Sequence, residues 1–147
     1  MSAISIRAAQ AAERDALVAL WWASARATHD FVRAADWDAY RPMVAEALIS
    51  AEAYVALGVD QALLGFMALD LNMVDMLFVA PTALRMGVGR QLLAFAQDLK
   101  GPLKVDVNEQ NQQGVAFYLA QGFVPVGRSE ADGTGRPYPI MHMAMPA

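Results

Sequence analysis

The sequence predicts a single α/β domain over residues 1–147. Its one β-sheet is mixed, as in α+β folds. Its 147 residues suit one domain of ordinary size. Segments with strand-like alternation and segments with helical periodicity succeed one another, and neither a repeat nor a low-complexity linker interrupts them. The predicted order is β-α-α-β-β-β-α-β-α-β-β. A hairpin series followed by βαβ units implies a mixed sheet with helices on both faces.

The first half of the chain supplies the hairpin series. Residues 3–7 alternate apolar and polar side chains and predict a strand. Two helices follow, over residues 9–28 and 36–50, with Pro42 expected near the first turn of the second or at a kink. Three strands are then predicted, and the last ends at Pro81; these strands span residues 53–57, 62–70 and 73–80.

The second half reads as alternating helices and strands. A helix over residues 87–99 ends at Lys-Gly-Pro, a strong stop signal. A strand over 103–108 follows, and then a short helix that Gly122 ends. Two last strands, linked by the turn-rich residues 131–136, complete the chain.

The composition narrows the classes of function. Apolar residues make up 56% of the chain, above the usual ~45–50%. The surplus suits ordinary core filling, a ligand cleft or a subunit interface, so it is compatible with a homodimer. A net charge of −4 without a basic run argues against a nucleic-acid binder.

Metal chemistry and membrane insertion are not expected either. The chain has no cysteine and only two histidines, His29 and His142, far apart in the sequence. Its N-terminus lacks the pattern of a signal peptide, and the apolar stretch at residues 16–25 is too short to cross a bilayer. We therefore expect a cytoplasmic protein without a metal.

The strongest functional signal lies where the third hairpin strand meets the following helix. Gly87 and Gly89 are placed at a strand-to-helix turn, although glycine inside a helix costs about 1 kcal/mol relative to alanine. Free amides at a helix N-terminus, together with glycines that allow close approach, suit a phosphate. A P-loop lysine and a third dinucleotide-binding glycine are both absent.

Two spaced motifs resemble the GCN5-related N-acetyltransferase (GNAT) superfamily. That family carries Arg/Gln-x-x-Gly-x-Gly/Ala after its fourth strand, and this chain has Leu-Arg-Met-Gly-Val-Gly at residues 84–89. The family's later Asn-x-x-Ala-x-x-x-Tyr motif is similar to residues 111–118, which a Gly-Phe pair follows at 122–123. The order of elements also matches along essentially the whole chain. This chain departs from the pattern at Leu84, in the usual Arg/Gln position, and at Gly114, where the family usually has alanine.

The resemblance implies an acetyl-CoA-dependent N-acetyltransferase. In this family acetyl-CoA lies between two splayed strands, and a primary amine attacks its thioester directly in a ternary complex. Amides of the glycine loop would bind the pyrophosphate, the strand before it would pair with the pantetheine arm, and Asn111 would bind the pantetheine end. The implied cofactor-binding residues are Leu77, Phe78, Val79, Arg85, Met86, Gly87, Val88, Gly89, Arg90 and Asn111. Asn111 equally suits a helix N-cap, and both roles can hold.

The resemblance also implies the groups that move protons. Tyr118 occupies the position of the family's general acid, which protonates the departing thiolate, although its helical stripe also suits a core tyrosine. Asp75 is the candidate base for the acceptor amine, and a solvent-facing strand residue is the alternative.

The acceptor side is less defined. His29 and Tyr138 are candidate substrate-binding residues, with a helix C-terminal position as the alternative for His29. His142, between two methionines of the last strand, is expected to be structural.

The expected reaction is acetyl transfer to a small-molecule or peptide amine. Two other functions stay open at this stage. One is a non-catalytic acyl-CoA sensor or regulatory subunit, because Leu84 departs from the motif, and the other is a subunit whose apolar surface mediates association. Tyr118 favours the enzyme, because a sensor needs no acid beside the sulfur.

Overall fold

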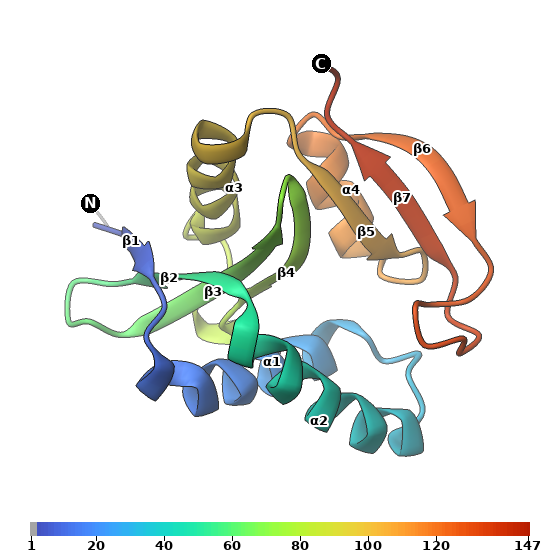
Figure 1. Cartoon of the computed structure of the whole chain (residues 1–147), viewed down its shortest axis with the longest axis horizontal. Coiled ribbons are helices and arrows are strands. Elements are labelled where there is room, and N and C mark those ends of the chain that lie inside the picture. The colour runs from blue at the N-terminus through green and yellow to red at the C-terminus, as the bar shows by residue number, and fades with distance from the viewer. Residues whose placement is uncertain (1–2) are drawn as a thin grey trace.

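A computed structural model, which describes residues 3–147, has three layers with a seven-stranded sheet in the middle (Figure 1). The strand order is β1-β2-β3-β4-β5-β7-β6. Neighbouring strands are antiparallel except for β4 and β5, which run parallel. The structure confirms the predicted fold class and order of elements.

The first half forms an antiparallel meander with two helices on one face. Its elements are β1 (Ser5–Ala8), the 3-10 turn η1 (Ala11–Glu13), α1 (Arg14–Thr28), α2 (Ala34–Ser50), β2 (Glu52–Leu57), β3 (Leu63–Asp70) and β4 (Met73–Val79). Pro42 lies inside α2 rather than near its first turn. The β3–β4 ladder shifts register, because Ala68 pairs with Met76 and Leu69 pairs with Val74. Asp75 is thus the extra residue of a β-bulge.

The second half begins with the 3-10 turn η2 (Pro81–Ala83), so β4 stops at the predicted proline. It continues through α3 (Val88–Lys100), β5 (Lys104–Asn108), α4 (Gln112–Ala120), β6 (Val124–Ser129) and β7 (Ile140–Ala144). Gly101 and Gly122 follow α3 and α4 with positive φ angles of 76° and 96°, as helix-ending glycines do. In the unit β4-α3-β5 the two parallel strands pair directly, whereas in β5-α4-β6 the parallel strands are separated by β7, which is antiparallel to both.

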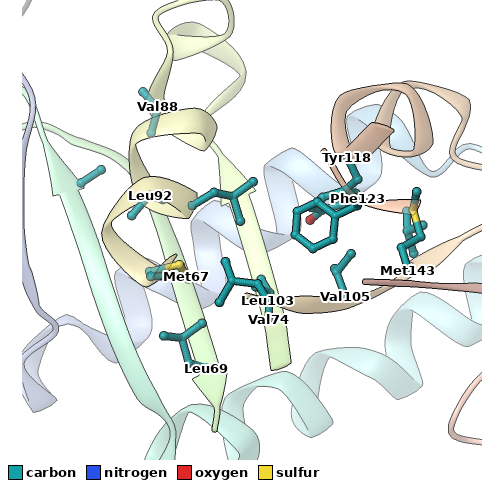
Figure 2. Close-up of a cluster of buried hydrophobic side chains, with 14 of the residues drawn as sticks. Met67, Leu69, Val74, Val88, Leu92, Leu103, Val105, Tyr118, Phe123 and Met143 are labelled. Carbon is teal, nitrogen blue, oxygen red and sulfur yellow. The ribbon is translucent and has the colours of Figure 1, made fainter. Parts of the chain in front are cut away.

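Two hydrophobic cores lie on opposite faces of the sheet. One packs α3 and α4 against the sheet and includes Leu92, Val105 and Phe123 (Figure 2). The other lies under α1 and α2. It holds all three tryptophans, Trp21, Trp22 and Trp37, with ring centroids 5.9–6.0 Å apart. Apolar side chains are therefore packed against both faces of the sheet.

The α-helices of the described part are 9–17 residues long. Between residues 3 and 147, none has the combination of length and apolar character that a bilayer-crossing helix requires.

Candidate functional site: a cleft where two parallel strands separate

The site begins where β4 and β5 stop pairing. Met73 pairs with Lys104 and Val74 with Val105, and beyond these residues the two strands diverge (Figure 1). The gap belongs to a cavity of about 700 Å³, lined by β4, the loop after it, β5, α4 and the end of α1. That volume lies in the ordinary range for small-molecule sites. Because β5 does not pair with Asp75–Val79, this edge of β4 is available to an extended ligand.

Two carboxylates occupy the point of divergence. Asp75 follows Val74 on β4, Asp106 follows Val105 on β5, and both line the cavity. Bulges commonly redirect a side chain next to an active site, and Asp75 is the bulged residue of β4. Partial burial, together with the negative charges of Asp70 and Asp106, raises the pKa of Asp75. A carboxylate with a raised pKa is better able to accept a proton.

The N-terminus of α3 forms one end of the cavity. Gly87, the N-cap, has φ = 81°, a left-handed conformation that glycine adopts without strain. The first backbone bond of the helix runs from Gln91 N–H to Gly87 O, at 3.0 Å. Among residues 3–147, no side chain caps this helix, so the amides of its first turn can meet an anion.

Gly89 has a different role from Gly87. A Cβ atom at Gly89 would lie 3.0 Å from Cζ of Phe117, so glycine lets α4 pack closely against the start of α3. The two helices that border the cleft therefore meet at this residue.

Two arginines flank the same turn. Arg85 adopts φ = 71°, and Arg85 and Arg90 both line the cavity. The Arg90 guanidinium lies beside the turn, because a Cβ atom at Gly87 would be 3.3 Å from its Nη2. Leu84, in the position that the family gives to Arg or Gln, is 54% exposed at the rim.

Asn111 is the N-cap of α4, as one of its two expected roles requires. Its Oδ1 accepts a hydrogen bond of 3.1 Å from Gly114 N–H. A Cβ atom at Gly114 would overlap Asn111 Nδ2 and lie 3.0 Å from Cγ, so the amide occupies the space of an alanine methyl group. Asn111 also lines the cavity, which leaves its second expected role, in ligand binding, available.

Tyr118 lies on α4 with its ring in the core and 8% of its surface exposed (Figure 2). Phe117 and Phe123 surround the ring, with centroids 5.2 and 5.3 Å away. Only burial perturbs its hydroxyl, to which no hydrogen bond is found among the described residues, and Tyr118 lines the cavity. Burial raises the pKa of Tyr118, so the phenol keeps its proton at neutral pH and can donate it.

The end of α1 closes the cavity on the opposite face of the sheet. His29 follows the helix, and its Nδ1 lies 2.7 Å from Thr28 Oγ1 and 3.1 Å from Ala25 O. Burial lowers the pKa of His29, so the ring is neutral at pH 7. Ser24, Thr28 and His29 supply the polar groups of this wall.

Tyr138 lies outside the cavity lining. It is 4% exposed, donates a hydrogen bond to Asp36 and accepts one of 3.0 Å from Arg33 N–H. These bonds, with the Arg136–Asp36 pair at 3.0 Å, fasten the loop before β7 to the start of α2. Tyr138 is not among the residues that line the cavity.

The cavity brings together every other residue that the sequence singled out for catalysis or binding. Sequence reasoning missed Asp106, Asn108, Phe117, Ser24 and Thr28, which also line it. The alternation of residues 103–108 placed Asp106 on a polar strand face, but nothing local indicated that this face borders Asp75. Within residues 3–147, no three potential metal ligands gather.

Comparison with known proteins agrees with this geometry. Residues 23–145 match the family model described as "Acetyltransferase (GNAT) domain". The chain is 40% identical over 141 residues to "Peptidyl-lysine N-acetyltransferase YjaB" of Escherichia coli K12, covering 96% of each chain.

Solved structures show the same fold. The solution structure of apo-form YjaB from Escherichia coli superposes with a TM-score of 0.91, at 40% identity and 97% coverage of both chains. The crystal structure of the PaiA N-acetyltransferase from Thermoplasma acidophilum in complex with coenzyme A has a TM-score of 0.76, at 17% identity and 99% coverage of both chains, and supports the fold alone. The chain belongs to the GNAT family and is an N-acetyltransferase.

Proposed function

We propose that this protein transfers the acetyl group of acetyl-CoA to the ε-amine of a lysine in a peptide or protein. The observation that carries the proposal is that one cavity is lined both by Tyr118, a protonated phenol, and by Asp75, the carboxylate at the strand bulge. The peptidyl-lysine acceptor is taken from the printed name of the YjaB relative.

The donor suits the cleft in shape and charge. The free amides of the first turn of α3 and the side chains of Arg85 and Arg90 would hold its diphosphate. The unpaired edge of β4 at Leu77, Phe78 and Val79 would receive the pantetheine arm as an added strand, with Asn111 at the pantetheine end.

In the proposed reaction the acceptor nitrogen loses two protons and the departing sulfur gains one. A lysine amine is protonated at neutral pH, so Asp75 accepts one proton before the nitrogen forms its bond to the thioester carbonyl carbon. The C–S bond then breaks, and the Tyr118 O–H protonates the thiolate. The nitrogen loses its second proton, which restores the tyrosine hydroxyl directly or through water, and Asp75 releases the first proton to solvent. One proton is released overall, alongside the acetylated amine and the thiol.

The proposal is tested by acetyl-CoA turnover on a panel of acceptors. A lysine peptide with a blocked N-terminus, a peptide whose amine is only at its N-terminus, and a polyamine separate the acceptor classes. Thiol release and the mass of the product are measured for each. We expect turnover on the lysine peptide. The mass of its side chain should increase by about 42 Da, the mass of an acetyl group less that of the hydrogen it replaces. Exclusive turnover on either other acceptor would overturn the lysine assignment.

A further inference from the structure

A line of three hydrogen-bonded side chains crosses the sheet from the cavity toward its edge. Asp106 on β5 is the register partner of His142 on β7, and its Oδ1 lies 2.6 Å from His142 Nδ1. On the other side of the ring, Nε2 lies 2.7 Å from Ser129 Oγ on β6. One end of this line borders the cavity through Asp106, and the other is on the edge strand.

We propose that His142 and Ser129 are positioning residues that hold the Asp106 carboxylate toward the acceptor ammonium group. This inference rests on the proposed acetylation of lysine. Asp106 would contact the acceptor, whereas His142 and Ser129 would act only through Asp106.

An ionised carboxylate can only accept hydrogen bonds, so His142 Nδ1 donates to Asp106 Oδ1. On the other side of the ring, the contact between Nε2 and the Ser129 hydroxyl holds the imidazole in place, whichever of the two atoms donates. One carboxylate oxygen is then held in place, and Oδ2 is left for another donor. A histidine held by a third group orients its partner in this way in many enzyme sites.

The charges around the carboxylate favour a cationic ligand. Asp106 and Asp75 are the first residues beyond the last β4–β5 pair, and Asp70 adds a third negative charge. In the part of the chain that the structure describes, no lysine or arginine pairs with Asp75 or Asp106, and Arg128 on β6 pairs with Glu109 and Glu130 instead. A lysine ammonium group would therefore meet two carboxylates that no lysine or arginine neutralises, in the cavity that Tyr118 also lines.

The inference is tested with Asp106→Asn, His142→Ala, His142→Asn and the double variant Asp106→Asn/His142→Ala. Steady-state kinetics give KM for the lysine peptide and KM for acetyl-CoA separately. Asp106→Asn should raise the KM for the peptide about 10-fold or more, since hydrogen bonds to charged groups are strong, and leave the KM for acetyl-CoA unchanged. His142→Ala should raise the same KM to a smaller extent. His142→Asn should recover most of the loss, because its amide can replace the Nδ1 donor.

The double variant distinguishes positioning from an independent role. If His142 acts through Asp106, the double variant should be no worse than Asp106→Asn alone. Glu130→Gln removes a negative charge whose side chain is 93% exposed and serves as the matched control. Thermal unfolding of each variant identifies any variant that fails to fold. If His142→Ala fails to fold, His142→Asn is used in its place.

Three results would overturn the inference: additive effects in the double variant, no recovery in His142→Asn, or an unchanged peptide KM in Asp106→Asn. Each of these leaves the proposed function intact, because the wild-type enzyme still acetylates lysine. Absence of lysine acetylation by the wild-type enzyme would instead overturn the proposed function, and this inference with it.

Discussion

Replacing Gly114 by alanine separates the stability of the fold from binding of the donor. The added methyl group would take the space of the Asn111 amide, which caps α4 from the other side of the same turn. Asn111 must therefore leave its observed position, while the helix gains a better helix-forming residue.

The two effects on stability nearly cancel. Alanine in place of glycine favours a helix by about 1 kcal/mol. Loss of the N-cap hydrogen bond costs about 1 kcal/mol. We thus expect the free energy of unfolding to change by less than about 1 kcal/mol, whereas loss of one ligand hydrogen bond should raise the KM for acetyl-CoA roughly 2- to 10-fold.

The assay combines chemical denaturation with steady-state kinetics. Gln112→Ala, at an exposed neighbouring position outside the cavity lining, is the control for a change in helix propensity alone. A Gly114→Ala enzyme with an unchanged KM for acetyl-CoA would refute a binding role for the observed Asn111 conformation. A decrease of more than about 2 kcal/mol in the free energy of unfolding would show that the gain in helix propensity does not offset the lost N-cap.

Four further outcomes are expected. Tyr118→Phe should lower kcat by about 10²-fold with both KM values unchanged, because general acid catalysis contributes that order of magnitude; undiminished turnover would exclude Tyr118 as the acid. Gly87→Asp should abolish binding of acetyl-CoA measured by calorimetry, since it adds a side chain and a negative charge where φ is 81°; normal binding would contradict the diphosphate site. The acceptor kcat/KM should fall as the pH drops through the raised pKa of Asp75, and Asp70→Asn, which removes a neighbouring negative charge, should move this acid limb to lower pH. Tyr138→Phe should reduce the free energy of unfolding by about 1 kcal/mol, because it removes the two hydrogen bonds of the Tyr138 hydroxyl, and should leave both KM values unchanged; a higher acceptor KM would instead support a substrate role.

Local patterns in the sequence were enough to predict most of the fold. Alternation identified the strands over residues 3–7 and 103–108, and the Lys-Gly-Pro sequence at 100–102 marked the end of α3. Gly87, Asn111 and Tyr118, which the motif spacing singled out, all line one cavity. These features depend on residues that are close in the sequence, which is why a single chain reveals them.

The features that were missed depend on contacts between distant residues. The bulge at Asp75 interrupts an almost continuous apolar run, so no change of periodicity marks it. The partners Asp106 and His142 are 36 residues apart, and Asp36 and Tyr138 are 102 apart. Asp106 meets His142 only because β7 pairs with β5. Asp36 meets Tyr138 only because the loop before β7 folds onto α2. Alternation and motif spacing carry neither piece of information.

All three tryptophans cluster at α1 and α2, so the intrinsic fluorescence of the enzyme reports on one region of the molecule. Trp37 contacts His29 at a centroid distance of 6.5 Å, and His29 lines the cavity on the side where we expect the acceptor to bind. Indole emission therefore originates from a single neighbourhood, in which closely spaced rings exchange excitation energy. Intrinsic fluorescence should respond strongly to an acceptor and weakly to the nucleotide portion of the donor, so the native protein can report, without any label, the order in which its two substrates arrive.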